Sequence, residues 1–291
     1  MQISILEKPI VKSHTVSSLS KPVTAWGVLR ATVVKDLRIA VRYRANLIGN
    51  IIELIIRMLF FLLLASVVAF DANEGQIMSG SDLFIFFQGA LILFAFRGTA
   101  LGTPLGAVGR DLYNGTLEFL YTNPCSRYAY YVGTVLSSVI INLPVFLPLY
   151  LVLVFYSGAH VENMLMILSV CVIVFVSLTA MGVMIAMLGL LWRRIDSIAG
   201  LINIAFEFLA GAYFPVSSFP QVVQYAAYIL PFTWGFDLIR YYSFGKDWNT
   251  ILPVWQEWTI LAMSAVIFTA LSRYLLKKVE RLAKQKGLHL I

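Results

Sequence analysis

Charged residues are scarce in this 291-residue sequence. Only 13% of the residues are Asp, Glu, Lys or Arg, whereas soluble domains carry about 25%. Hydrophobic residues make up 59%, which is more apolar surface than a soluble fold of this size can cover. The composition therefore excludes a soluble protein and indicates a multi-pass membrane protein. The formal net charge of +7 is then a signal of membrane topology, and no nucleic-acid partner is expected.

Residues that carry chemistry are also scarce. The two cysteines, Cys125 and Cys171, form no CxxC pair, so neither a disulfide framework nor a metal site is expected. The three histidines lie outside the long apolar runs, which hold no lysine and no aspartate pair, so an intramembrane enzyme lacks its catalytic groups. No GxxxxGK[ST] stretch is present to hold ATP phosphates. We therefore expect a chain that is not an enzyme and binds no cofactor itself.

The apolar runs predict an all-α membrane protein. A helix needs about 20 apolar residues to cross the hydrocarbon core. Six segments qualify, and they are 47–70, 83–103, 132–157, 164–191, 196–214 and 254–276. With an interfacial helix before them, these spans form one membrane domain at 24–276. A tail at 1–23 precedes the domain, without the apolar core of a cleaved signal peptide, and a basic tail at 277–291 follows it.

Lysine and arginine lie almost entirely on one side of these predicted spans. The two termini, the connection 104–131 and the turn 192–195 together carry seventeen of them. The segments on the other side carry two, Arg240 and Lys246. Because basic residues are retained in the cytoplasm, we expect a cell-membrane protein with both termini cytoplasmic.

The segment 24–45 predicts an amphipathic helix lying along the membrane surface. Apolar residues recur at spacings of three and four, at Trp26, Leu29, Val33, Leu37 and Val41. Charged residues occupy other positions of the same helix, namely Arg30, Lys35, Asp36, Arg38 and Arg42. Basic groups on such a helix meet lipid phosphates. The alternative is a basic stop that flanks the first span.

A polar stretch, GRDLYNGTLEFLYTNP at 109–124, separates the second span from the third. It predicts one or two turns of helix with an apolar side made by Tyr113, Leu117, Leu120 and Tyr121. Asp111 or Asn114 is expected to cap its start, and Asn123-Pro124 to end it. Such a short helix is marginal alone in water. It therefore indicates a cytoplasmic partner, or else an ordinary loop helix packed on the membrane surface.

Prolines divide the connection 215–253 into short pieces. Pro215, Pro220 and Pro231 interrupt it, so two helices of about ten residues are expected, at 219–229 and 232–243. Neither is long enough to span, and both are rich in aromatic residues, as interfacial segments are. We expect the pair to enter the outer leaflet and return, with protein covering the broken backbone ends.

Four ionisable residues lie at membrane depth, where they usually face protein or water. Glu53 and Arg57 are four residues apart on the first span and can pair on one face. Arg97 lies on the second span, and Glu207 lies on the fifth without a partner in its own span. From the residues alone they are structural, as an internal pair, a snorkelling or paired arginine, and a glutamate that pairs across helices, is protonated or faces a cavity. The family resemblance described below implies the other possibility, that they line a transport pathway or a subunit interface.

Three glycines recur at four-residue spacing on and after the second span. They are Gly98, Gly102 and Gly106. Small residues on one face allow close helix packing. The alternative is that Gly102 and Pro104 loosen the end of the span.

Together these features resemble the ABC-2-type permeases, the membrane subunits of one class of ATP-driven exporters. The most specific segments are GTLE at 115–118 followed by Pro124, GAYFPVSSFP at 211–220 and LPFTWGFDLIR at 230–240. The order of elements also matches, with an interfacial helix, two spans, a cytoplasmic helix and four further spans. The resemblance implies that the 24–45 helix is the family's elbow helix and that the 109–124 stretch is its coupling helix.

The resemblance also implies which residues meet the ATP-binding subunit. In the coupling helix these are Asp111, Asn114, Gly115, Thr116, Leu117 and Glu118, and in the elbow helix Trp26, Arg30, Asp36, Arg38 and Arg42. The re-entrant segment is implied to include Pro215, Pro220, Pro231, Asp237 and Arg240. Relatives often carry a charged residue before GTLE where this chain has Asn114, so a salt bridge at that position is not expected.

The implied function is outward transport powered by two separate ATP-binding subunits, which hold ATP and Mg²⁺. A second permease copy, identical or homologous, completes the complex. The apolar faces of the spans favour an amphiphilic or hydrophobic small molecule, drug-like or lipid-like, as substrate. A polysaccharide or glycolipid exporter of the same family is the alternative, and an ATP-independent channel or secondary transporter is a further one.

Overall fold

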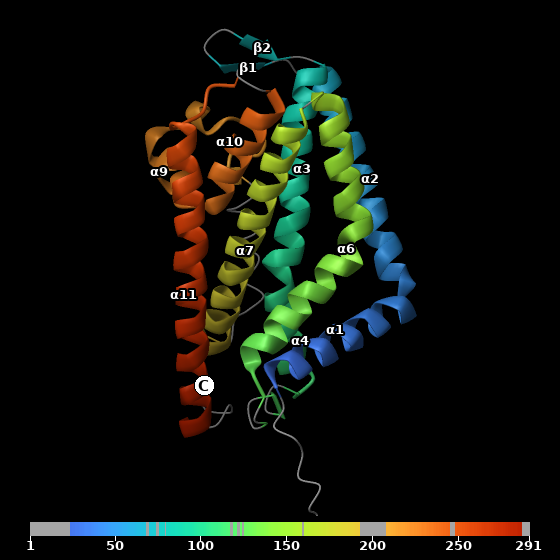
Figure 1. Cartoon of the computed structure of the whole chain (residues 1–291), viewed down its shortest axis with the longest axis vertical. Coiled ribbons are helices and arrows are strands. Elements are labelled where there is room, and N and C mark those ends of the chain that lie inside the picture. Colours follow the sequence, from blue (N-terminus) through green and yellow to red (C-terminus); the bar gives the residue numbers. More distant parts are fainter. Residues whose placement is uncertain are drawn as a thin grey trace, which may run out of the picture.

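A computed structural model describes residues 24–67, 70–73, 76–78, 80–116, 119–120, 123, 125–158, 160–192, 208–244 and 248–286. Long helices run side by side along one axis, and helix α1 (Ala25–Arg42) lies across one end of the bundle (Figure 1). Five stretches in the described chain are long and apolar enough to cross a membrane. They are Leu47–Val67, Ser81–Tyr113, Arg127–Ser157, Val161–Leu190 and Val254–Leu282. These match five of the six predicted spans, and most of the predicted span 196–214 lies outside the described residues.

The second predicted span is longer than its sequence pattern indicated. Helix α3 (Ser81–Ala100) is followed, after a turn at Leu101, by α4 (Gly102–Tyr113). Residues 104–113 were expected to begin a connection, but Leu105, Ala107 and Val108 are buried and keep this segment helical. Pro104 sits in the first turn of α4, where a missing N–H is tolerated.

The remaining long helices begin near their predicted positions, and all but the last also end near them. They are α2 (Arg44–Val67), α6 (Arg127–Ser157), α7 (Val161–Trp192) and α11 (Val254–Lys286). The Ser126 hydroxyl accepts a hydrogen bond from the Ala129 N–H and so caps the start of α6. Pro144 and Pro148 lie inside α6 without ending it, as is tolerated in membrane helices. Helix α11 continues beyond the predicted end of the last span at 276.

A short hairpin joins α2 to α3, where the sequence indicated only the end of a span and a loop. Strand β1 (Phe70–Asn73) pairs antiparallel with β2 (Gln76–Met78), with an irregularity between Asp71 and Asn73. The hairpin lies at the end of the bundle opposite to α1 (Figure 1). We call this the hairpin end of the molecule.

Helix α3 is the centre of the bundle. In its most apolar window 78% of the residues are buried, because α2, α6, α7 and α10 (Pro231–Phe244) surround it. The same measure is only 6% for α2, which lies at the periphery. Both helices are apolar enough to cross a membrane, but α3 is enclosed by protein and α2 is not.

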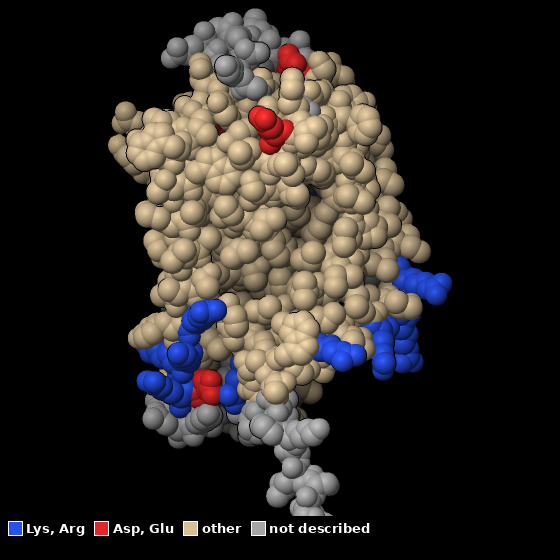
Figure 2. Space-filling model, in the orientation of Figure 1, with Lys and Arg blue, Asp and Glu red and all other residues tan. Residues whose placement is uncertain are grey.

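Charge is distributed unevenly between the two ends. Figure 2 shows lysine and arginine gathered at the end that holds α1 and the last turns of α11, with an acidic patch among them, while toward the other end only acidic residues are visible among the charged ones. We call the first of these the basic end. The two ends are thus chemically distinct, as the sequence indicated.

Candidate functional site

Helix α1 packs on α6 through a face that its apolar pattern did not identify. Thr24 caps the helix by accepting a hydrogen bond from the Gly27 N–H at 3.2 Å. Val28 and Thr32 are the buried residues, whereas Trp26 is 71% exposed and Val41 is 61% exposed. The prediction of a helix over 24–45 is thus confirmed for Ala25–Arg42. Trp26 and Val41, the first and last of the predicted apolar positions, are therefore not packed against the bundle.

The α1–α6 contact is close because α6 carries a glycine there. A Cβ at Gly133 would lie 3.0 Å from the Thr32 Cβ and 3.2 Å from the Leu29 carbonyl oxygen. Asp36, one turn beyond Thr32, accepts a hydrogen bond from the Ser137 hydroxyl of α6 at 3.0 Å. Among the predicted elbow residues, Asp36 is therefore the one held against the bundle, while Trp26, Arg30, Arg38 and Arg42 are exposed.

The polar stretch after α4 is organised differently from its prediction. Asn114 ends α4, since its N–H bonds to the Arg110 carbonyl oxygen, and Asp111 lies in the last turn of that helix. Neither residue therefore caps the start of a following helix, which corrects the sequence prediction. Gly115 has φ +68°, a left-handed conformation that favours glycine and turns the chain.

Helical bonding resumes immediately after this turn. The Leu120 N–H bonds to the Thr116 carbonyl oxygen at 3.2 Å. The Asn123 side chain donates to the Phe119 carbonyl oxygen at 2.8 Å and so ends the segment, as predicted. Leu117 and Glu118 lie outside the described residues. Thr116 thus occupies the starting position that the sequence assigned to Asp111 or Asn114.

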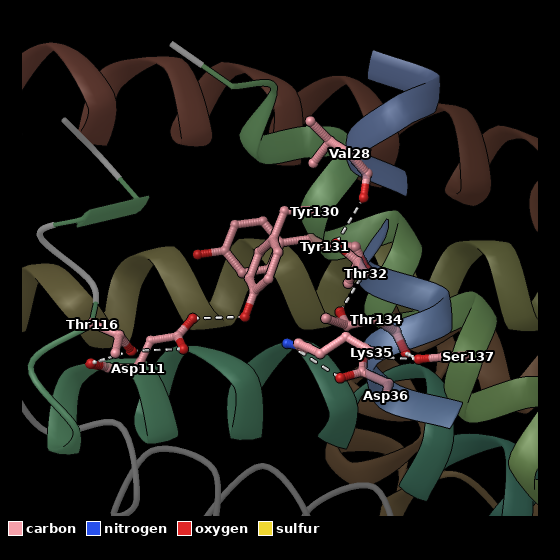
Figure 3. A network of polar contacts seen from close by, with 10 residues as sticks. All are labelled: Val28, Thr32, Lys35, Asp36, Asp111, Thr116, Tyr130, Tyr131, Thr134 and Ser137. Carbon is pink, nitrogen blue, oxygen red and sulfur yellow. Dashed lines mark hydrogen bonds and ion pairs between the residues drawn. The ribbon is translucent and has the colours of Figure 1, made fainter. Parts of the chain in front are cut away.

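Asp111 is the centre of a polar network that joins three helices (Figure 3). Its Oδ2 accepts a hydrogen bond from the Tyr130 hydroxyl of α6 at 2.8 Å. Its Oδ1 accepts one from the Thr116 hydroxyl at 3.1 Å. The carboxylate therefore ties the GTLE segment to α6.

The network continues from Tyr130 to α1. The Lys35 ammonium lies 5.4 Å from the centroid of the Tyr130 ring, within cation–π distance. Lys35 also pairs with Asp36 at 3.2 Å, and Asp36 returns to α6 through Ser137 (Figure 3). A continuous set of polar contacts thus runs from Thr116 on the GTLE segment to Asp36 on α1. We call it the α1–α4–α6 network.

A second polar link at the basic end joins α6 to α11. Arg127 is 8% exposed and pairs with Glu280, and it also donates to the Asn123 carbonyl oxygen at 3.4 Å. In the sequence, Arg127 stands out only as a basic residue of the connection 104–131. Glu280 is the single acidic residue in the basic tail 277–291, and this was the available sign that it has a partner. The sequence did not show that the partner is Arg127.

Removing one member of this pair is expected to destabilise the permease strongly. Leaving a buried charge uncompensated costs about 3–5 kcal/mol, so Glu280→Gln should lower the thermal unfolding midpoint in detergent. The double variant Arg127→Gln/Glu280→Gln should recover part of the loss. Arg281→Gln, at an exposed neighbouring position, is the matched control. Equal midpoints for Glu280→Gln and Arg281→Gln would contradict the assignment.

The structure brings together three of the four charges that the sequence placed at membrane depth. Arg57 Nε lies 3.0 Å from Glu53 Oε1, which confirms the predicted pair. Both residues and Arg97 line a cavity of about 370 Å³ between α2, α3 and α6. The Arg97 guanidinium also lies 5.3 Å from the centroid of the Phe94 ring. Glu207 lies outside the described residues.

Uncharged polar residues complete the lining of this lateral cavity. Asn50 on α2 donates to Asn142 on α6 at 3.1 Å, and Ser138 lies one turn before Asn142. The other walls are apolar, including Leu54, Leu91 and Phe146. The cavity therefore combines a charged, hydrogen-bonding side with an apolar side. The asparagine pair could not be predicted from the sequence, because its members are 92 residues apart.

The predicted glycine face is not where helices approach most closely. No described residue outside the local helix lies within 4 Å of a Cβ placed at Gly98 or Gly102. The break between α3 and α4 at Leu101 agrees instead with the alternative that this region loosens the span. Among the glycines that the structure describes, the closest backbone approach is at Gly182 of α7, where a Cβ would lie 2.8 Å from the Leu101 carbonyl oxygen.

The proline-bounded pair of helices is present at the hairpin end. Helix α9 (Gln221–Tyr228) follows Pro220 and the short 3-10 turn η1 (Val216–Ser218), which itself follows Pro215. Helix α10 begins at Pro231. These bounds confirm the two predicted helices. However, α10 is buried among α3, α7 and α11, whereas both helices were expected to be interfacial.

Asp237 and Arg240 hold the ends of this segment in place. Asp237 accepts hydrogen bonds from the Trp248 indole and the Ile251 N–H, both at 2.8 Å. Arg240 donates to the Gly211 carbonyl oxygen at 2.8 Å, and its guanidinium lies 3.6 Å from the Phe86 ring centroid. Both residues are buried and engaged, so their role in the fold is structural.

Apolar helices of spanning length around a buried central helix define a multi-pass helical membrane protein. A family-wide sequence profile of the ABC-2 type transporter matches residues 27–244, which is more than half of the chain. The chain therefore belongs to the ABC-2 type transporter family. It is a permease component of an ABC transporter and not itself catalytic, and this family implies association with an ABC ATP-binding subunit. No curated protein sequence matches the chain.

Proposed function

We propose that this chain is the permease subunit of an ABC exporter that moves an amphiphilic or hydrophobic small molecule outward. Two separate subunits hydrolyse ATP with Mg²⁺, and a second permease copy completes the pathway. The observation that carries the proposal is the α1–α4–α6 network. It connects the two elements through which an ATP-binding subunit would act on the spans, within a chain of the ABC-2 family.

The basic end is proposed to face the cytoplasm. Basic residues are retained on that side of a membrane, and they gather around α1 and the end of α11 (Figure 2). This orientation places the GTLE segment where a cytoplasmic ATPase can reach it. The chain would then sit in the cell membrane with both termini inside.

The docking surface for the ATP-binding subunit is proposed to include the apolar residues beside the GTLE turn. Tyr113 is 93% exposed, and Phe119 is 70% exposed. Large aromatic side chains exposed beside a polar turn are typical of an interaction site. Both flank Thr116, which belongs to the α1–α4–α6 network, so movement of a docked subunit would have a path of contacts into α6.

An amphiphilic substrate is favoured by the lateral cavity. The charged side of the cavity would bind the polar group of the substrate, and the apolar side of the cavity would contact its hydrocarbon portion. Export from the cytoplasm or inner leaflet would then follow alternating access driven by the ATPase.

The first experiment is to purify the chain from its native membrane in mild detergent, with cross-linking, and to identify co-purifying proteins by mass spectrometry. A stoichiometric P-loop protein supports the proposal. Reproducible purification without any nucleotide-binding partner would overturn it and favour an ATP-independent transporter.

Glu118→Ala is expected to uncouple transport from ATP hydrolysis in the assembled complex. The substitution changes the proposed docking surface and leaves the spans intact, so the permease should still fold. Transport into inside-out vesicles and substrate-stimulated ATP hydrolysis are the measurements. Glu162→Ala, at an exposed acidic residue in the first turn of α7, is the matched control. Normal coupling in Glu118→Ala would count against the assignment of this helix.

A further inference from the structure

The lateral cavity lies at membrane depth and has free space on its α3 side. Its lining comes from α2, α3 and α6, within the predicted spans 47–70, 83–103 and 132–157. Most of α3 is buried, but Gly98 on the cavity wall is exposed. No described residue outside the local helix lies within 4 Å of a Cβ placed there. The cavity is therefore accessible along α3, and a side chain at Gly98 would occupy part of it.

Charged side chains in the lining prevent the cavity from being filled by hydrocarbon alone. The side chain of Glu53 is 63% exposed and that of Arg57 is 38% exposed, although Arg57 Nε and Glu53 Oε1 lie 3.0 Å apart. Ionisable groups at membrane depth are costly against hydrocarbon and usually face protein or water. The exposed part of this ion pair therefore needs a polar neighbour. Water or the polar part of a ligand has to occupy the cavity.

Guanidinium groups outnumber carboxylates in the described lining. Arg57 on α2 and Arg97 on α3 reach the same cavity from different helices, and Glu53 is the one carboxylate beside them. A guanidinium has five N–H donors, so an arginine that already has one partner can still bind a ligand. Its paired N–H groups match the geometry of phosphate oxygens. An anionic group rich in hydrogen-bond acceptors therefore fits this lining better than a cation does.

We propose that the lateral cavity binds the phosphate head group of an anionic, lipid-like amphiphile. Arg57 and Arg97 bind the phosphate oxygens, while the apolar wall at Leu54, Leu91 and Phe146 contacts the adjoining hydrocarbon. The apolar wall distinguishes this ligand from free phosphate, which would leave it uncovered. The inference deepens the proposed function by naming the charge and head group of the substrate, and it rests on that function for calling the bound amphiphile a substrate.

Lipid binding to the purified permease tests the site. The full chain, with any subunits that co-purify, is titrated calorimetrically in neutral detergent with short-chain phosphatidylglycerol, and separately with phosphatidylcholine of the same chains. Both lipids carry a phosphate, but phosphatidylcholine adds a quaternary ammonium that cancels its charge. Phosphatidylglycerol should bind about tenfold more tightly or better, since one hydrogen bond to a charged group corresponds to about that factor. Inorganic phosphate at the same concentration should not displace it.

Substitutions in the cavity should abolish this preference. Gly98→Leu fills the cavity without changing its charge and should leave the unfolding midpoint unchanged, whereas Arg97→Gln removes one guanidinium. Each should weaken phosphatidylglycerol binding by about tenfold or more. Gly49→Leu, at an exposed position of α2 outside the lining, is the control for added bulk. Arg38→Gln, at an exposed position of α1, is the control for lost charge. Neither control should change binding.

Four outcomes would overturn the proposal. They are equal affinity for the two lipids, displacement by inorganic phosphate, undiminished binding in Gly98→Leu, or an equal loss in Arg38→Gln and Arg97→Gln. The titration needs no ATP. A chain that prefers phosphatidylglycerol but purifies without an ATPase would therefore refute the exporter and retain the site. An ATPase complex that binds both lipids equally would do the reverse.

Discussion

Asp111→Ala is expected to reduce transport by about tenfold or more while the assembled complex still hydrolyses ATP. The substitution removes both hydrogen bonds by which the GTLE segment is attached to α6. Hydrogen bonds to a charged group contribute about 1.5–3 kcal/mol each, and about 1.4 kcal/mol corresponds to a factor of ten. Without Asp111, movement of a docked subunit would shift the GTLE turn without displacing α6. The ratio of substrate transported to ATP hydrolysed is the measurement.

Two smaller substitutions test the two hydrogen bonds of Asp111 separately. Tyr130→Phe removes only the bond to α6, and Thr116→Val removes only the bond to the GTLE segment. Each should lower the ratio less than Asp111→Ala does. Tyr128→Phe is the control, because that tyrosine lies on the same helix outside the α1–α4–α6 network and keeps its ring beside Arg273.

The thermal unfolding midpoint distinguishes coupling from folding in this series. A transmission role predicts a lower transport ratio at a nearly unchanged midpoint, since Asp111 is only partly buried at the edge of the bundle. If transport, ATP hydrolysis and the midpoint fall together in Asp111→Ala, the network is only structural. Unchanged coupling in that variant would remove the network from the mechanism.

The sequence predicted the elements whose causes are local. Uninterrupted apolar runs locate α2, α6, α7 and the start of α11 within a few residues, because spanning length and composition are properties of the segment itself. Proline likewise fixes where α9 and α10 begin, since it cannot continue a preceding helix. The Glu53–Arg57 pair was accessible for the same reason, because the two residues are neighbours on one helix.

The contacts that organise the basic end could not be obtained in this way. Tyr130 and Asp111 belong to different helices, and Arg127 meets Glu280 across 153 residues. Nothing in the local pattern specifies such partners. Capping was also assigned wrongly at Asp111, because its side chain binds Thr116 from the end of the preceding helix. Asp111 has a side chain suited to capping the start of a helix, but it lies in the last turn of α4 and binds the segment that follows.

Helix α1 illustrates a different limit. Its periodicity correctly predicted an amphipathic helix, but an apolar face can meet either lipid or protein. The structure places Val28 and Thr32 against α6 and leaves Trp26 exposed. A small residue on the partner helix, Gly133, decides which face is used. Complementarity of this kind depends on both helices and is absent from the pattern of one.

Gly182→Val is expected to prevent the permease from folding correctly. A Cβ at this position would lie 2.8 Å from the Leu101 carbonyl oxygen, 2.9 Å from its Cα and 3.0 Å from the Ala100 carbonyl oxygen. These are backbone atoms at the turn between α3 and α4, so no side chain can rotate away. Overpacking a well-packed core usually costs about 1–3 kcal/mol. The cost here should be at the upper end or above, because α7 must separate from the central helix. Gel filtration and thermal unfolding in detergent measure the effect.

Two further glycine substitutions show whether the loss of stability in Gly182→Val comes from steric overlap or from helix propensity. Gly182→Ala should lower the unfolding midpoint less than Gly182→Val, since the alanine adds only the Cβ. Gly109→Ala in α4 is the control, because no described residue lies within 4 Å of its Cβ. It should be neutral or stabilising, since alanine is favoured over glycine in a helix by about 0.5–1 kcal/mol. Equal midpoints for Gly182→Ala and Gly109→Ala would mean that α7 can move away from Leu101 at little cost. The turn between α3 and α4 would then be flexible. A rigid connection from the GTLE segment to the spans would have to run through α6 alone.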